Sequence, residues 1–214
     1  MLSSIITTGV LLAVLQALPT VAIPTVANRD ASPLDGYGIE ELTWEVETTP
    51  GGPSVNITGT VEHVVEELGK INPTFVSDFG IENPDNSSAV DAPIEARAYY
   101  LKEWYCDVFG LAKLEAIQAG LVYLNGVPGK PTNGPGPGNC GRVSCSHSAA
   151  IYWCNDNTVS KTIDTFGYIS GAAQTIINKC GITPQITPLG VFDYVKGQVF
   201  MTDNWNVIIK YDKC

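Results

Sequence analysis

Apolar and polar positions first alternate regularly between residues 42 and 47, where Leu42, Trp44 and Val46 are separated by polar residues. A period of two residues indicates a strand with one buried face. The segment 50–53 is rich in proline and glycine and predicts a turn, and residues 55–57 are expected to form a short partner strand.

The spacing then becomes helical. Apolar residues recur three and four positions apart from residue 61 to residue 68, which predicts an amphipathic helix with Thr60 as its N-cap. Gly69 and the dipeptide Asn72-Pro73 are expected to end this helix.

The middle of the chain alternates between regular and irregular patterns. Residues 74–95 are expected to be irregular, and the apolar spacing over 111–124 predicts a second helix. Residues 125–139 contain five Gly and four Pro, which excludes a regular element there. The run 149–155 is a strand candidate, with Ile151 and Trp153 on one face and Tyr152 and Cys154 on the other.

A third helix is expected to start at Asp156 or Thr158 and to end at Cys180, since apolar residues recur at helical spacing between them. A hairpin should follow, with strands over 194–201 and 205–211. The order of these elements predicts an α+β fold, namely a small antiparallel sheet with helices packed on one side.

The N-terminal residues 1–22 are typical of an export signal. No charge occurs between Ile5 and Leu18, and this apolar core is too short to span a bilayer. Cleavage is expected after Ala22, with Ala17 and Ala27 as further candidates. The alternative is a buried N-terminal helix. No later apolar stretch approaches spanning length, so no membrane span is expected.

Charge divides the rest of the chain. Residues 30–103 contain 15 acidic against three basic residues, whereas residues 104–214 contain seven against eight. We therefore expect a flexible leader over 23–38, an acidic cysteine-free α/β region over 39–104 and a cysteine-rich α+β region over 105–214. The acidic part argues against nucleic acid or an anionic membrane as a partner, and its simplest role is a solvated surface.

The cysteine count is even, which in an exported chain indicates a disulfide framework. The six cysteines are Cys106, Cys140, Cys145, Cys154, Cys180 and Cys214. They allow 15 pairings, among which the sequence does not choose. A zinc site is poorly supported, because no two cysteines have the two-residue spacing of zinc ligands and the chain has only two histidines.

Two sequons lie in the acidic half, at Asn56-Ile57-Thr58 and Asn86-Ser87-Ser88. In a eukaryotic secreted chain, Asn56 and Asn86 are glycan acceptors if they are exposed.

Hydrolase chemistry based on histidine finds little support. His63 is predicted to face solvent from its helix, and His147 lies between two serines whose side chains point away from it in an extended chain. A distant serine, Ser77 or Ser160, would need an orienting carboxylate from one of two aspartates, Asp156 or Asp164. The Gly-x-Ser-x-Gly nucleophile motif is absent.

A glycosidase with two carboxylates is not excluded, because a pair 5–10 Å apart is all that it requires. Candidate carboxylates are those of Glu40, Glu41, Glu45, Glu47, Glu66 and Glu67. The glycines at 134, 136 and 138 alternate with prolines, which lack the N–H groups of a phosphate cradle. No cofactor, metal site or catalytic residue is therefore assigned.

Several motifs resemble those of a known group. These motifs are Gly136–Cys145, Ala150–Asn157, Cys180, Gly197-Gln198, Asn204–Val207 and Cys214. Together with residues 42–73, they are similar to small secreted cysteine-rich proteins of filamentous fungi, which are largely uncharacterised. A looser resemblance of layout is to effectors of the Ecp2 type and to killer-toxin-like α/β sandwiches. What this resemblance implies is a role in interaction with hosts or competing microbes.

The function expected from the sequence is therefore that of a secreted, disulfide-stabilised fungal effector or toxin-like protein that binds a host or microbial protein or glycan. The alternative is an extracellular hydrolase acting on polysaccharide or peptide. A structural cell-wall protein is disfavoured, because tandem Ser/Thr-rich repeats are absent.

Overall fold

The computed structural model describes residues 36–81 and 101–214. The expected signal peptide, nearly all of the expected leader and the sequon at Asn86 lie outside these residues. The centre of the fold is a six-stranded sheet in the order β1-β7-β8-β13-β12-β4. Its strands are β1 (Gly38–Glu40), β4 (Leu101–Tyr105), β7 (Asn139–Ser146), β8 (Ala149–Asn155), β12 (Gly197–Met201) and β13 (Trp205–Tyr211). All neighbours are antiparallel except β1, which runs parallel to β7.

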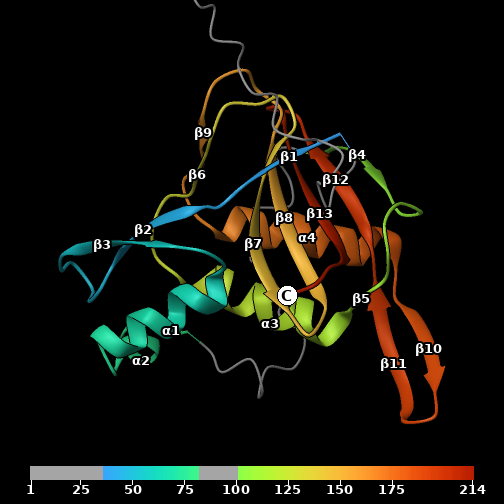
Figure 1. The fold of residues 1–214 in the computed structure, drawn as a ribbon, viewed down its shortest axis with the longest axis horizontal. Helices are drawn as coiled ribbons and strands as arrows, with labels where there is room; N and C mark the ends of the chain where they lie inside the picture. Colours follow the sequence, from blue (N-terminus) through green and yellow to red (C-terminus); the bar gives the residue numbers. More distant parts are fainter. Residues whose placement is uncertain (1–35, 82–100) are drawn as a thin grey trace, which may run out of the picture.

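Two helices, α3 (Leu114–Gly126) and α4 (Gly167–Cys180), pack against one face of this sheet (Figure 1). Ile151 and Trp153 of β8 are fully buried in the main core on this side, while Tyr152 and Cys154 belong to a second cluster on the opposite face. The predicted face assignment of β8 is correct. The predicted α+β class, with helices on one side of a sheet, is confirmed.

Residues 43–78 form a smaller layer beside the main sheet. The strands β2 (Thr43–Glu47) and β3 (Ser54–Thr58) form an antiparallel hairpin, followed by α1 (Val61–Ile71) and the short α2 (Phe75–Asp78). Trp44 stacks on Phe166 at the start of α4, with ring centroids 4.0 Å apart. The predicted strands and helix are confirmed here. Gly69 does not end α1, which continues to Ile71, and α2 lies in a stretch that was expected to be irregular.

Two predicted helices begin later than expected. The helix predicted over 111–124 starts at Leu114, because Ala112–Lys113 form the short strand β5 against β11 (Gly190–Val195). The helix expected from Asp156 or Thr158 starts only at Gly167, because Lys161–Thr162 form β9. Strand β9 pairs with β6 (Thr132–Asn133), inside the segment expected to contain no regular element. The apolar residues before Gly167 are buried from a loop instead of a helix.

Besides the short strands β5, β6 and β9, the sequence patterns did not predict β1, β4, β7, β10 (Thr183–Thr187) and most of β11. Strand β7 contains a register shift between Arg142 and Ser144, which breaks the alternation that a sequence pattern would reveal. The strands β10 and β11 form an additional hairpin, and β4 lies at the sheet edge. The first strand expected over 194–201 is therefore divided between the end of β11 and β12.

All six cysteines are paired. The bridges are Cys106–Cys180, Cys140–Cys154 and Cys145–Cys214. The first joins the residue after β4 to the end of α4, the second crosses from β7 to β8, and the third ties β7 to the residue at position 214. The expected disulfide framework is thus present and connects the sheet, a helix and the C-terminal segment.

Candidate functional site

A pocket of about 190 Å³ opens on the sheet face opposite α3 and α4. It lies where β1 and residues 59–60 approach β7 and β8. Its polar lining consists of Glu40, Glu41, Thr60, Arg142 and Tyr152. Two of the sequence-predicted carboxylates, Glu40 and Glu41, border this cavity, so its chemistry bears on the hydrolase alternative.

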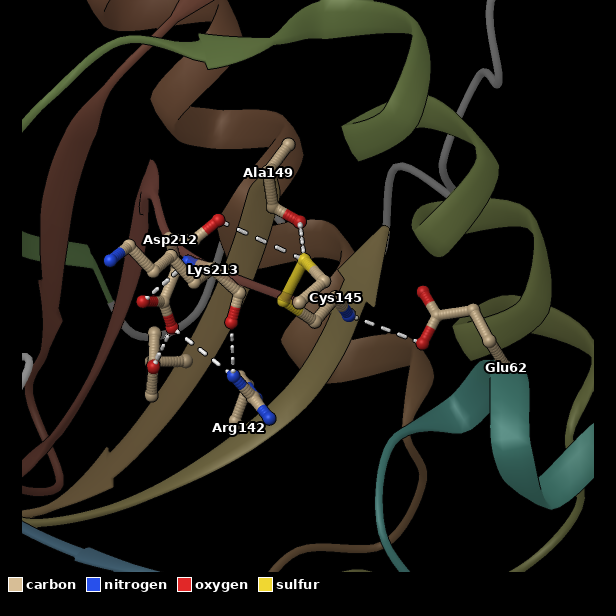
Figure 2. Close-up of polar contacts among 8 residues, drawn as sticks. Glu62, Arg142, Cys145, Ala149, Asp212 and Lys213 are labelled. Carbon is tan, nitrogen blue, oxygen red and sulfur yellow. Dashed lines mark hydrogen bonds and ion pairs between the residues drawn. A yellow bond between two sulfur atoms is a disulfide. The ribbon is translucent and has the colours of Figure 1, made fainter. Parts of the chain in front are cut away.

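Two of the lining residues, Arg142 and Tyr152, contact Asp212, whose polar contacts are drawn in Figure 2. Arg142 donates from Nη1 to Asp212 Oδ2 at 3.3 Å and to the carbonyl of Lys213 at 3.1 Å. Tyr152 donates its hydroxyl proton to the same Asp212 oxygen. Burial, together with the Asp212 carboxylate, raises the pKa of Tyr152 well above its usual value. These side chains hold the C-terminal segment against β7. Their polar groups are hydrogen-bonded to one another and have a structural role.

Two carboxylates that the sequence singled out, Glu40 at the pocket and Glu47 on β2, are bonded to backbone groups. Glu40 accepts a hydrogen bond at 2.6 Å from the backbone N–H of Gly134. Glu45 lies on the exposed face of β2, as predicted, and Glu47 on the same face accepts from the N–H of Gly51 at 2.9 Å. Because Glu40 and Glu47 cap backbone groups at different places, they do not converge on a common substrate position.

Within residues 36–81 and 101–214, neither histidine has the serine and carboxylate partners that a histidine-dependent hydrolase requires. His63 is exposed on α1, and His147 is exposed in the tight turn between β7 and β8, with φ 47°. Among the described residues, no hydrogen bond or ion pair connects either histidine to a serine or a carboxylate. Ser77 donates instead to the carbonyl of Thr74 at 2.8 Å, and Ser160 lies exposed in a loop.

The sequence patterns did not reveal the role of Glu62. From the first turn of α1, Glu62 accepts hydrogen bonds from the hydroxyl of Ser144 and, at 3.2 Å, from the N–H of Cys145 (Figure 2). Ser144 is fully buried, and a Cβ on Gly120 of α3 would overlap its side chain. Because this contact joins residues 82 positions apart, no local pattern could have identified it.

A second polar cluster brings together residues from three motifs of the sequence analysis: Gly197-Gln198, Asn204–Val207 and Ala150–Asn157. Gln198 donates to the hydroxyl of Tyr37 at 2.9 Å and to Asn206 Oδ1 at 3.0 Å, and Asn206 donates to Asp156 at 2.8 Å. Gln198 and Asn206 are buried. Burial raises the pKa of Tyr37. Since these polar groups satisfy one another, the motifs organise the sheet and the strands beside it.

Among the described residues, the most exposed large apolar side chains lie elsewhere, on the hairpin β10–β11, which projects from the body of the protein (Figure 1). Ile186, Leu189 and Val191 are 87%, 89% and 65% exposed. Ile186 and Val191 are directly paired across the two strands. Large aliphatic side chains held in water on a protruding element mark a surface for interaction.

The fold and these surfaces define a disulfide-stapled α+β protein with a projecting apolar hairpin. Comparisons with protein-family models, with curated proteins and with solved structures found no match. No helix in residues 36–81 and 101–214 is long and apolar enough to cross a bilayer. Within the same residues, no three His, Cys, Asp or Glu side chains are grouped to hold a metal ion.

Proposed function

We propose that this chain is an exported extracellular protein of the effector or toxin-like kind, which acts by binding a component of a host or of a competing microbe. The observation that carries the proposal is the projecting hairpin β10–β11, whose aliphatic side chains are exposed on a frame stapled by three disulfides. The resemblance of its motifs to small secreted fungal proteins supports the same function.

Export is the first part of the proposal to test. We expect the protein in culture medium to begin at Ile23, after cleavage behind Ala22. N-terminal sequencing of the secreted protein measures this directly. A secreted chain that keeps Met1, or a chain that stays in the cell, contradicts export through this signal.

Glycosylation belongs to the same proposal. Asn56 is exposed on β3, on the same side of the hairpin as Glu45, and is thus accessible to a glycan. Asn86 is the second proposed acceptor. Intact-mass measurement of the secreted protein should give a lower mass for Asn56→Gln and for Asn86→Gln than for the wild type. Treatment of the wild type with an N-glycosidase should remove the mass of both glycans.

The effect of substitutions on activity distinguishes the binding proposal from the hydrolase alternative. In a growth-inhibition or host-response assay, we expect His147→Ala and His63→Ala to keep full activity, since both side chains are exposed and neither lies on the hairpin β10–β11. Reduction of the disulfides should abolish activity. If His147→Ala abolished activity while circular dichroism and melting temperature stayed unchanged, the hydrolase alternative would replace the binding proposal.

A further inference from the structure

We propose that the tip of the hairpin β10–β11 inserts into the surface of a neutral, zwitterionic lipid bilayer. This inference deepens the proposed function, on which it rests for an extracellular site of action, by identifying the partner of the hairpin as lipid. Two features of the hairpin carry it: a tip with exposed aliphatic side chains and no charged residue, and polar groups of the turn that are bonded within the hairpin.

The first feature is the composition of the tip. Its side chains Ile186, Leu189 and Val191 are largely in water, and residues 181–192 contain no charged residue. A charged side chain would oppose entry into the acyl region, whereas aliphatic side chains gain free energy on leaving water. The tip therefore meets the requirements of a bilayer interface.

The second feature is the state of the backbone at the turn. Proline at 184 and 188 removes two N–H groups. The N–H of Leu189 donates to Thr187 Oγ1 at 3.2 Å, and the Thr187 hydroxyl donates to the carbonyl of Gly190 at 3.0 Å. The amide of Gln185 bonds to the carbonyl of Pro184 at 3.2 Å. Polar backbone groups enter hydrocarbon only when they are bonded within the protein, and this turn bonds several of its own.

These features favour lipid over a protein partner. Strand β10 is the outer strand of its three-stranded sheet, but Pro184 interrupts the row of donors that a partner strand would need. Three tip side chains also cover much less area than the roughly 800 Å² that each member of a stable protein complex buries. A bilayer needs neither strand pairing nor a large complementary surface.

The net charge of the chain selects the kind of bilayer. A formal charge of −10 repels anionic lipid surfaces, whereas a zwitterionic surface carries no net charge to oppose approach. Binding by aliphatic insertion should therefore be strongest on phosphatidylcholine and should not weaken as salt increases.

The test is co-sedimentation of the purified protein with phosphatidylcholine vesicles at 0.1 and 0.5 M NaCl. We expect binding at both salt concentrations. The double variant Ile186→Ser/Leu189→Ser should partition at least about a hundredfold more weakly, since each aliphatic side chain contributes about tenfold or more. The matched control is Val159→Ser, which removes an aliphatic side chain that is 67% exposed in another loop and should leave partitioning unchanged.

A variant that places a reporter at the tip gives an independent measurement. Leu189→Trp should shift tryptophan emission to shorter wavelength on adding vesicles and should be quenched by brominated lipid, while Val159→Trp should show neither change. Circular dichroism and melting temperature, unchanged in every variant, establish that the fold is retained.

Several results would overturn the inference: no binding of the wild type to phosphatidylcholine, equal loss in the Val159→Ser control, binding to anionic vesicles alone, or a lipid-free dimer that the double variant abolishes. The last would make a second copy of this chain the partner. If the double variant lost growth-inhibition or host-response activity while the wild type failed to bind vesicles, the proposed function would stand and lipid would be the wrong partner.

Discussion

Asp212 accepts from three donors: the guanidinium of Arg142 and the hydroxyl of Tyr152, which connect the C-terminal segment to the sheet, and the backbone N–H of the neighbouring Lys213. Its side chain is 12% exposed, so little water can replace a lost partner. A carboxylate in such a place depends on its protein donors, and removal of one of them has a cost that an exposed ion pair would not show.

We expect Tyr152→Phe to lower the free energy of unfolding by about 1.5–3 kcal/mol, because it deletes a hydrogen bond to a charged group while keeping the ring in the core. The measurement is urea unfolding at pH 7, followed by circular dichroism. Tyr211→Phe is the control: this ring is 48% exposed, and its change should stay within about 0.5 kcal/mol. Equal effects of both substitutions would show that the Tyr152–Asp212 bond contributes nothing special.

The raised pKa of Tyr152 also predicts how stability depends on pH. In the unfolded chain a tyrosine loses its proton near pH 10, whereas in the fold Tyr152 keeps it to higher pH. The stabilisation is thus complete below about pH 10 and decreases as pH rises further, because the unfolded state alone then releases the proton. Unfolding free energies measured between pH 8 and 11 should decline less steeply in Tyr152→Phe than in the wild type. Parallel curves would contradict this expectation.

At the scale of elements, the two glycines Gly69 and Gly197 show why the same residue type has opposite roles. Gly69 lies inside α1, and a Cβ built there meets nothing within 4 Å. Gly197 opens β12 with φ 149°, and a Cβ there would come within 2.9 Å of Ile176 in α4 and of the carbonyl of Tyr105. The first is a weak point in a helix, and the second permits close packing of α4 on the sheet.

Gly69→Ala should therefore stabilise the protein by about 0.5–1 kcal/mol, because alanine loses less conformational entropy than glycine on entering a helix. Gly197→Ala should destabilise it by about 1–3 kcal/mol, since the added methyl group overlaps packed atoms on a backbone that favours glycine. Thermal unfolding of both variants checks the pair of signs. A stabilising Gly197→Ala would show that β12 and α4 can separate without loss.

Elements with an uninterrupted pattern could be predicted from sequence, and those shaped by distant contacts could not. Strand β8 is predicted with its exact bounds because its faces carry different apolar residues, and α1 because its stripe is regular. The bulge in β7 interrupts the alternation of buried and exposed residues, and β10 has no buried face to produce one. Neither strand therefore shows the pattern by which a strand is predicted. The start of α4 at Gly167 depends on β9 pairing with β6, about 30 residues earlier, which local periodicity does not report.

The candidate site was even less accessible to sequence reasoning. The sequence identified Glu40 and Glu47 only as candidates among many carboxylates. Their hydrogen bonds from backbone N–H groups depend on the tertiary fold and could not be predicted. The segment 182–191 mixes aliphatic with polar residues and carries no catalytic motif, and only its projection from the fold makes it a candidate surface. Composition can indicate which chemistry is present, whereas geometry decides which groups remain free to use it.

At the scale of the whole molecule, the three disulfides stabilise different parts of the fold. Two of them close long loops, with sequence separations of 74 and 69 residues, and the third joins β7 to β8 over 14 residues. In the chain-entropy model a longer closed loop restricts the unfolded chain more, by about 4–5 kcal/mol against about 3 kcal/mol. The long-range bridges therefore contribute most to holding the sheet, α4 and the C-terminal segment together.

The accessibility of the bridges predicts the order in which they are reduced. Cys214 is exposed, whereas Cys140 and Cys154 are both fully buried in the cluster behind the sheet. Thiol–disulfide exchange requires a thiolate to reach a sulfur atom, so Cys145–Cys214 should open first and Cys140–Cys154 last. Limited reduction at pH 8, followed by alkylation and peptide mass mapping, measures the order. Early labelling of Cys140 and Cys154 would mean that β7 and β8 separate before the C-terminal segment does. If Cys145–Cys214 opens first as expected, hydrogen bonds from Arg142 and Tyr152 still hold the C-terminal segment to the sheet, and the unfolding free energy should fall by about 2–5 kcal/mol while the sheet remains formed.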